Sequence, residues 1–212
     1  MLSKYPTKLR MCWNAEISLK TFLVGMAGIG LGAYVGLSLP VLLFSFTIAT
    51  MQLIEYVVWT HYDNDKVNYT ASVAAVVLLW LQPVASMLIL PSSSLKTTML
   101  SIYVLLSLVG QSPLWTKGMK KEYSMKRAAN GHLSWNFLSK EPRTYIELAV
   151  YFFFLFTPIL LTGNLDLLAL SIGTLGLSIY SYWRENTWGS MWCWIVNALV
   201  FLLVGKTVIK KV

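Results

Sequence analysis

Two polar side chains stand three residues apart inside one of the long apolar stretches of this sequence. Gln52 and Glu55 would share a helical face, because residues three apart on an α-helix are neighbours. Glu55 lies about 7 Å before the end of the stretch at position 60, at a rise of 1.5 Å per residue. An ionisable group inside a bilayer is costly, so Glu55 is a candidate functional residue that should face other helices. We expect Arg184, Asn197 or Gln82 as its partner; the alternative is a structural carboxyl that hydrogen-bonds a neighbouring helix.

The other candidate binding residues lie at or near the ends of the apolar stretches. We expect these particular ends to face the side of the membrane on which the N-terminus lies. They offer carboxylates, amides, an imidazole, a thiol and indoles, which bind ligands through hydrogen bonds, stacking and cation–π contacts. In chain order they are Asn14, Glu16, Trp59, His132, Trp135, Glu185, Trp192, Cys193 and Asn197. With Gln52 and Glu55 they predict a polar pocket with a tryptophan rim. An uneven interfacial aromatic belt would give the same distribution of tryptophans.

No established catalytic or metal-binding spacing occurs in the chain. A zinc hydrolase usually has several His or carboxylate ligands, whereas His61 and His132 are the only histidines. Cys12, Cys193, His132 and Glu16 remain as an alternative ligand set, but they come from four segments without motif spacing. We therefore expect no metal, no cofactor and no assigned catalytic residue. Whether the protein is an enzyme stays open.

The elements that must position these residues follow from composition. Of 212 residues, 56% are hydrophobic and 12% charged, against about 25% charged in soluble domains. A membrane helix needs about 20 mostly apolar residues. We therefore predict an all-α fold, a polytopic membrane helix bundle forming a single integral membrane domain over residues 1–212. Its seven predicted spans lie near 21–39, 40–60, 70–90, 97–115, 145–162, 165–183 and 191–209.

The only long loop, 116–144, contains a hairpin signal. Asn130-Gly131 separates two segments in which apolar residues alternate, and this pair favours a tight turn between strands. We predict a small β-hairpin whose apolar side rests on the membrane surface or on the helix ends.

Basic residues predict the orientation and the partner. Only four of the 17 Lys and Arg residues fall on the side opposite the N-terminal tail and the long loop: Lys96, Lys206, Lys210 and Lys211. The positive-inside rule therefore places the N-terminus and the hairpin in the cytoplasm. The net charge of +8 suggests membrane lipids as partners, with anionic headgroups at 117–127. No base-reading motif is present, so we expect no nucleic acid; the sequence does not indicate an oligomeric state.

Several strings resemble an uncharacterised multi-span membrane protein family of large DNA viruses and eukaryotic microbes. They are Met11-Cys12-Trp13-Asn14-Ala15-Glu16, Gln52-Leu53-Ile54-Glu55-Tyr56 followed by Trp59, Asn130-Gly131-His132-Leu133 with Trp135, and Gly189-Ser190-Met191-Trp192-Cys193-Trp194. The resemblance covers nearly the whole chain. It implies a shared multi-span fold and no activity, so no catalytic residue is carried over.

Together these observations predict a small transporter, channel or receptor-like protein with a polar, tryptophan-rimmed pocket. The alternatives are a membrane-embedded enzyme acting on lipid headgroups through Glu16, Glu55, His132 and a cysteine, and a structural membrane scaffold. A transporter predicts a polar path past Glu55. An enzyme predicts His132 or Cys193 within hydrogen-bond reach of a carboxylate. A scaffold predicts Gln52 and Glu55 fully occupied by other helices, with no cavity.

Overall fold

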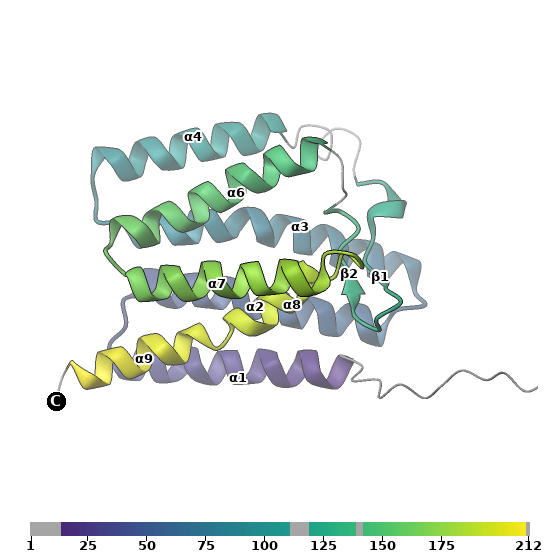
Figure 1. Cartoon of the computed structure of the whole chain (residues 1–212), viewed down its shortest axis with the longest axis horizontal. Helices are drawn as coiled ribbons and strands as arrows, with labels where there is room; N and C mark the ends of the chain where they lie inside the picture. The colour runs from purple at the N-terminus through teal and green to yellow at the C-terminus, as the bar shows by residue number, and fades with distance from the viewer. Residues whose placement is uncertain (1–13, 111–118, 139–141, 211–212) are drawn as a thin grey trace, which may run out of the picture.

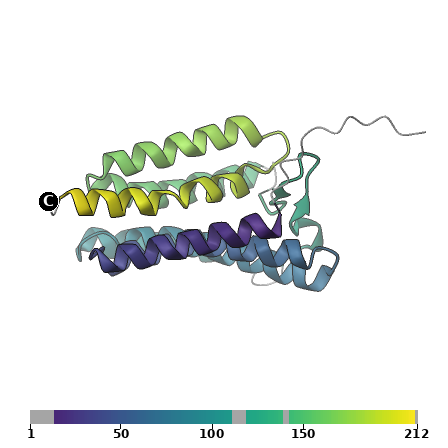
Figure 2. The ribbon, with the colours of Figure 1, turned by 90° about the horizontal axis from the view of Figure 1, so that it is seen from below.

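The computed structural model describes residues 14–110, 119–138 and 142–210. Its helices lie side by side along the long axis of the molecule (Figure 1). They are α1 (Ala15–Tyr34), α2 (Leu39–Thr60), α3 (Asp65–Met87), α4 (Ser94–Gly110), α6 (Pro142–Leu161), α7 (Leu165–Tyr182), α8 (Trp188–Val196) and α9 (Leu199–Ile209). Figure 2 shows α1, α2 and α3 in one layer and α7 with α8 and α9 in another. The strands β1 (Lys126–Arg127) and β2 (Leu133–Ser134) and the short 3-10 helix η1 (Lys121–Tyr123) lie across one end of the bundle, which we call the hairpin end (Figure 1).

Local signals in the sequence account for where the helices begin and turn. The side chain of Asn14 accepts a hydrogen bond from Ile17 N at the start of α1, and Asn64 accepts one from Val67 N at the start of α3. Proline lies in the first turn of α2, where its missing N–H costs nothing. Gly163, between α6 and α7, has φ +71°, a conformation that glycine adopts without strain.

Six of the helical segments are long and apolar enough to cross a membrane. They are Ala15–Tyr34, Leu39–Thr60, Asp65–Met87, Pro142–Leu161, Leu165–Tyr182 and Trp188–Ile209, the last formed by α8 and α9 together. The predicted span 97–115 appears as the shorter apolar helix α4, and positions 111–115 lie outside the described residues. The chain is thus a multi-pass membrane protein by helix length and hydropathy.

The predicted hairpin is confirmed, as a very short antiparallel pair. Lys126 pairs with Ser134 and Arg127 with Leu133. The turn uses Gly131 at φ +85°, and the side chain of Asn130 accepts a hydrogen bond from His132 N at 3.1 Å. The hairpin packs against helix ends, as expected, because its apolar residues join a buried cluster with residues of α2, α3 and α8.

Candidate functional site

The carboxyl group of Glu55 is buried and hydrogen-bonded near the hairpin end of α2. Its side chain is 3% exposed. The indole N–H of Trp135 donates to Oε1 at 2.9 Å, and the amide of Gln52 donates to Oε2 at 3.3 Å. The hydroxyl of Ser190, in the first turn of α8, also hydrogen-bonds this carboxyl. We call Gln52, Glu55, Trp135 and Ser190 the Glu55 cluster; three separate segments of the chain meet in it.

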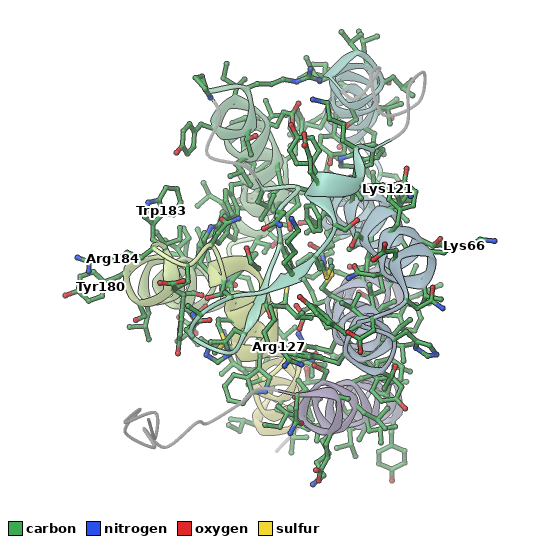
Figure 3. All side chains as sticks on the ribbon, turned by 90° about the vertical axis from the view of Figure 1, so that its right-hand side faces the viewer. Lys66, Lys121, Arg127, Tyr180, Trp183 and Arg184 are labelled. Carbon is green, nitrogen blue, oxygen red and sulfur yellow. The ribbon has the colours of Figure 1, made fainter. Side chains whose placement is uncertain are left out.

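The expected partners of Glu55 were wrong. Arg184 is exposed, and Figure 3 shows it on the outer flank of the hairpin end. Asn197 donates to Thr21 O at 3.4 Å, and Gln82 donates to Thr47 O at 3.4 Å. Ser190 and the role of Trp135 as a donor were not predicted from the sequence, because the expected partners all lay in or beside other long apolar stretches and the indole donor comes from the loop.

Backbone geometry around Trp135 brings its ring to Glu55. Asn186, a non-glycine residue at φ +54°, donates from its side chain to Trp135 O at 3.1 Å. Gly189 leaves room for the ring, since a Cβ at this position would lie 2.7 Å from Trp135 Cε3. The loop between α7 and α8 and the first turn of α8 therefore shape the seat of the indole.

A second polar network holds β1 against α3. Asn68 donates to Met125 O at 3.0 Å, and Met125 N donates to the hydroxyl of Ser72 at 2.9 Å. That hydroxyl in turn donates to Asn68 Oδ1 at 3.2 Å. Arg127 N donates to the hydroxyl of Tyr62 at 3.0 Å. The hairpin is thus bound to α3 by buried polar groups and to the turn after α2 by the exposed bond to Tyr62, and it is a fixed part of the bundle.

Two further predicted site residues lie near this cluster without joining it. The ring of Trp59 lies under the guanidinium group of Arg127, 5.1 Å from its centroid. His132 is buried in the hairpin, with its ring edge-on to Tyr182 at 5.5 Å. Burial lowers the pKa of His132, because a buried imidazole is costly to charge.

The remaining predicted residues are spread over the molecule. Asn14 caps α1 and Glu16 pairs with Lys20 at 2.5 Å, both on the surface. Glu185 is exposed. Asn197 lies between α8 and α9 and packs against α1, where a Cβ on Gly25 would lie 2.6 Å from its Oδ1. The structure therefore joins Gln52, Glu55 and Trp135 by hydrogen bonds and packs Cys193 in the same buried cluster as Trp135. Trp192 lies in a neighbouring buried cluster, and the other predicted residues stay apart. Cys12 lies outside the described residues.

A half-open cavity of about 650 Å³ lies beside the Glu55 cluster, and some of its lining residues, such as Leu106 and Ile146, are exposed. We call it the chamber. Helices α3, α4, α6 and α8 and the loop around Trp135 line it, mostly with apolar and aromatic side chains. Representative lining residues are Val76, Trp80, Leu106, Ile146, Trp135 and Trp192. Gln52 and Glu55 do not line it, whereas Trp135 belongs to both sites, so its indole is the partition between them.

The inner end of the chamber is closed by packed side chains. Tyr103 of α4 and Phe154 of α6 lie with ring centroids 5.1 Å apart, within a buried cluster that includes Met87 and Met99. The hydroxyl of Tyr103 donates to Trp80 O at 3.1 Å. These contacts join α3, α4 and α6 below the chamber and separate it from the opposite end of the bundle.

Charged residues stand where the chamber meets the hairpin end. Lys120, Arg143 and Glu147 all line it. Arg143 pairs with Glu147 at 2.8 Å and also donates to Gly110 O, which connects α6 to the end of α4. Arg143 was not among the predicted site residues. Its position four residues before Glu147 was the available signal in the sequence, because residues four apart are neighbours on a helix.

Among the described residues, no group of three or more His, Cys, Asp or Glu side chains is placed to hold a metal ion. The predicted alternative ligand set is thus not assembled among its described members Glu16, His132 and Cys193. Comparison of the chain with protein-family models, with curated proteins and with solved structures found no significant match in any of the three.

Proposed function

We propose that the protein is a receptor-like or carrier-like membrane protein that binds a small apolar or amphiphilic molecule in the chamber. The observation that carries the proposal is the aromatic cavity of about 650 Å³, closed at its inner end and bordered by charge at the hairpin end. Small-molecule sites have volumes of about 300–1,000 Å³ and are mostly apolar with a few polar groups. The chamber has this size and this chemistry.

The geometry supports a ligand beside Trp135 and not one at Glu55. Both oxygens of the Glu55 carboxyl already accept hydrogen bonds within the chain. A ligand at this carboxyl would have to displace Trp135, which is 2% exposed. Of the residues predicted to bind, Trp135, Trp192 and Cys193 line the chamber. The proposed ligand therefore still contacts tryptophans, but it lies on the side of Trp135 that faces away from Glu55.

The closed inner end favours binding over conduction. A channel requires a continuous path between the two membrane faces, whereas the Tyr103–Phe154 contact and the surrounding methionines fill the bundle below the chamber. A carrier would have to separate α4 from α6 at this contact. A receptor needs only the chamber, and this is the simpler function for the observed packing.

The proposal includes seven crossings, with the hairpin end in the cytoplasm. Helix α4 has 17 residues, or about 25 Å at 1.5 Å per residue, and it runs beside α6 (Figure 1). The first helix begins at the hairpin end and α9 ends at the opposite end, as an odd number of crossings requires (Figure 1). Lys66, Lys121, Arg127 and Arg184 all lie at the hairpin end (Figure 3), and the positive-inside rule favours the cytoplasm for this end. The basic stretch 117–127 would then contact anionic headgroups.

An uncharged brominated fatty alcohol tests the chamber, because bromine quenches nearby tryptophans and Trp80, Trp135, Trp188 and Trp192 line this cavity. In detergent micelles we expect quenching that saturates. Val76→Phe, which places a ring in the chamber, should abolish the saturable part, whereas Ala74→Phe on the exposed face of the same helix should not. Quenching that rises linearly with the alcohol in every variant would show partition into the micelle alone and would overturn the proposal.

A further inference from the structure

The mouth of the chamber carries a charge pattern that its walls lack. Away from the mouth, the lining of α3, α4 and α6 is apolar and aromatic, with Ser107, Tyr103 and Tyr151 as its hydroxyl groups. At the mouth, Lys120 and Arg143 contribute two cations and Glu147 one anion. Lys120 also lies 3.6 Å from Glu122, an exposed carboxylate that does not line the chamber. A ligand that fits this arrangement has an apolar body and a negatively charged end.

The backbone at the mouth adds to this preference. Helix α6 begins at Pro142, so Arg143 and the buried Thr144, which also lines the chamber, occupy its first turn. The first N–H groups of a helix have no partner within the helix and carry a partial positive charge. The helix start, the guanidinium group and the Lys120 ammonium group therefore act on the same region.

The length of the chamber fits a chain. From Arg143 to Phe152, the lining residues of α6 cover about 14 Å at 1.5 Å per residue. In the proposed arrangement of seven crossings, the mouth would lie at the level where the headgroups of a bilayer begin, and the Tyr103 end would lie at the depth of the acyl chains. A membrane amphiphile would keep both of its parts at their ordinary depths inside this chamber.

We propose that the chamber binds an anionic single-chain amphiphile, with the acyl chain between α3, α4 and α6 and the carboxylate or phosphate at Lys120 and Arg143. This inference rests on the proposed function, because it names the ligand class of the same cavity. Arg143 keeps its hydrogen bonds to Glu147 and to Gly110 O, and the remaining N–H groups of its guanidinium group can donate to the headgroup. Charge-assisted hydrogen bonds of this kind are the strong ones.

The experiment compares a brominated fatty acid with the brominated fatty alcohol of equal chain length, at a pH where the acid is ionised, by saturable tryptophan quenching in micelles. We expect the acid to bind about tenfold more tightly, a difference that corresponds to about 1.4 kcal/mol. Unlabelled lysophosphatidate and lysophosphatidylcholine then compete with the bound acid. Stronger competition by lysophosphatidate would indicate a phosphate headgroup, and weak competition by both would indicate a carboxylate.

Lys120→Gln and Arg143→Gln should each reduce the ratio of acid affinity to alcohol affinity. The Lys120 side chain is 71% exposed and its pair with Glu122 is a surface ion pair, which contributes little to stability, so this variant tests mainly the charge. Lys66→Gln is the matched control, because Lys66 lies at the same end and points outward (Figure 3). Equal saturable binding of acid and alcohol would overturn the proposed ligand class, while the proposal that the chamber binds a ligand would stand. Absence of saturable binding by either probe would overturn both.

Discussion

The Glu55 cluster and the chamber are neighbouring regions with opposite chemistry. In the Glu55 cluster, polar groups are buried and all three donors point at one carboxyl, so the region is filled. The chamber is a volume of about 650 Å³ with mainly apolar walls and charges at its mouth. One indole, that of Trp135, separates them. The Glu55 carboxyl, the main candidate in the sequence, thus holds the loop around Trp135 in place. The space for a ligand lies between helices whose lining residues are mostly apolar.

The largest effect on the contrast between the two regions is expected from Trp135→Ala, because this side chain separates them. The variant removes a buried indole that packs with Phe137 and leaves Glu55 Oε1 without its donor. Truncation of buried tryptophans costs about 3–5 kcal/mol, and we expect a loss of this size in the free energy of unfolding in micelles. Trp194→Ala, at a side chain that is 37% exposed, is the control. Equal effects of the two variants would contradict a structural role for the Trp135–Glu55 contact.

Gly189→Ala tests the position of the Trp135 indole from the side of α8. A methyl group at Gly189 would lie 2.7 Å from Trp135 Cε3 and 3.3 Å from Leu138 Cδ1, so the indole must shift. Overpacking of this kind costs about 1–3 kcal/mol. Gly173→Ala on α7 meets nothing within 4 Å and should stabilise by about 0.5–1 kcal/mol. Thermal unfolding in one detergent compares the signs, and a stabilising Gly189→Ala would show that the indole is not seated as described.

Hydropathy predicted where helices cross the bilayer better than where they begin. The first helix was expected from position 21 and begins at Ala15, and the third was expected from 70 and begins at Asp65. In both cases an asparagine cap and polar residues extend the helix beyond its apolar part. Apolar runs indicate contact with lipid, while helix ends depend on backbone hydrogen bonds, so the two limits differ here by about one and a half turns.

The candidate site was predictable only in part. The alternation around Asn130-Gly131 predicted the hairpin and the buried face that carries Trp135. Depth in an apolar run predicted that Glu55 is buried with polar partners. The partner itself comes from a residue 80 positions away, a pairing that no local pattern encodes. The chamber depends on the distance of α4 from α3 and α6. This distance is set by tertiary packing and cannot be predicted from the composition of the helices.

Glu55→Gln sharpens the contrast between the two regions. The amide keeps a carbonyl oxygen for the Trp135 indole, and we expect a loss of about 1 kcal/mol, the size of one altered hydrogen bond. Probe binding in the chamber should stay within about twofold of the parent chain, since Glu55 does not line the cavity. Glu55→Leu removes the acceptor of all three donors, Trp135, Gln52 and Ser190, at about 1–3 kcal/mol for each buried donor that is left unsatisfied. A Glu55→Gln variant that folds but loses probe binding or solute flux in liposomes would indicate that the ligand binds at the Glu55 carboxyl and not in the chamber.

The smallest expected effect is the pH dependence contributed by His132. Burial lowers the pKa of this imidazole below its ordinary value of 6.5. Below that value the unfolded chain binds a proton more readily than the folded one, so folding stability is present above pH 6.5 and is lost as the pH falls through the lowered pKa. His132→Gln should reduce the slope of unfolding free energy against pH in this acid range and leave neutral pH nearly unchanged. Because His132 lies on the hairpin and not in the chamber, probe affinity at neutral pH should also be preserved. An unchanged slope would contradict the burial of the imidazole, while a lost affinity would mean that the hairpin positions Trp135 through His132 as well as through Glu55.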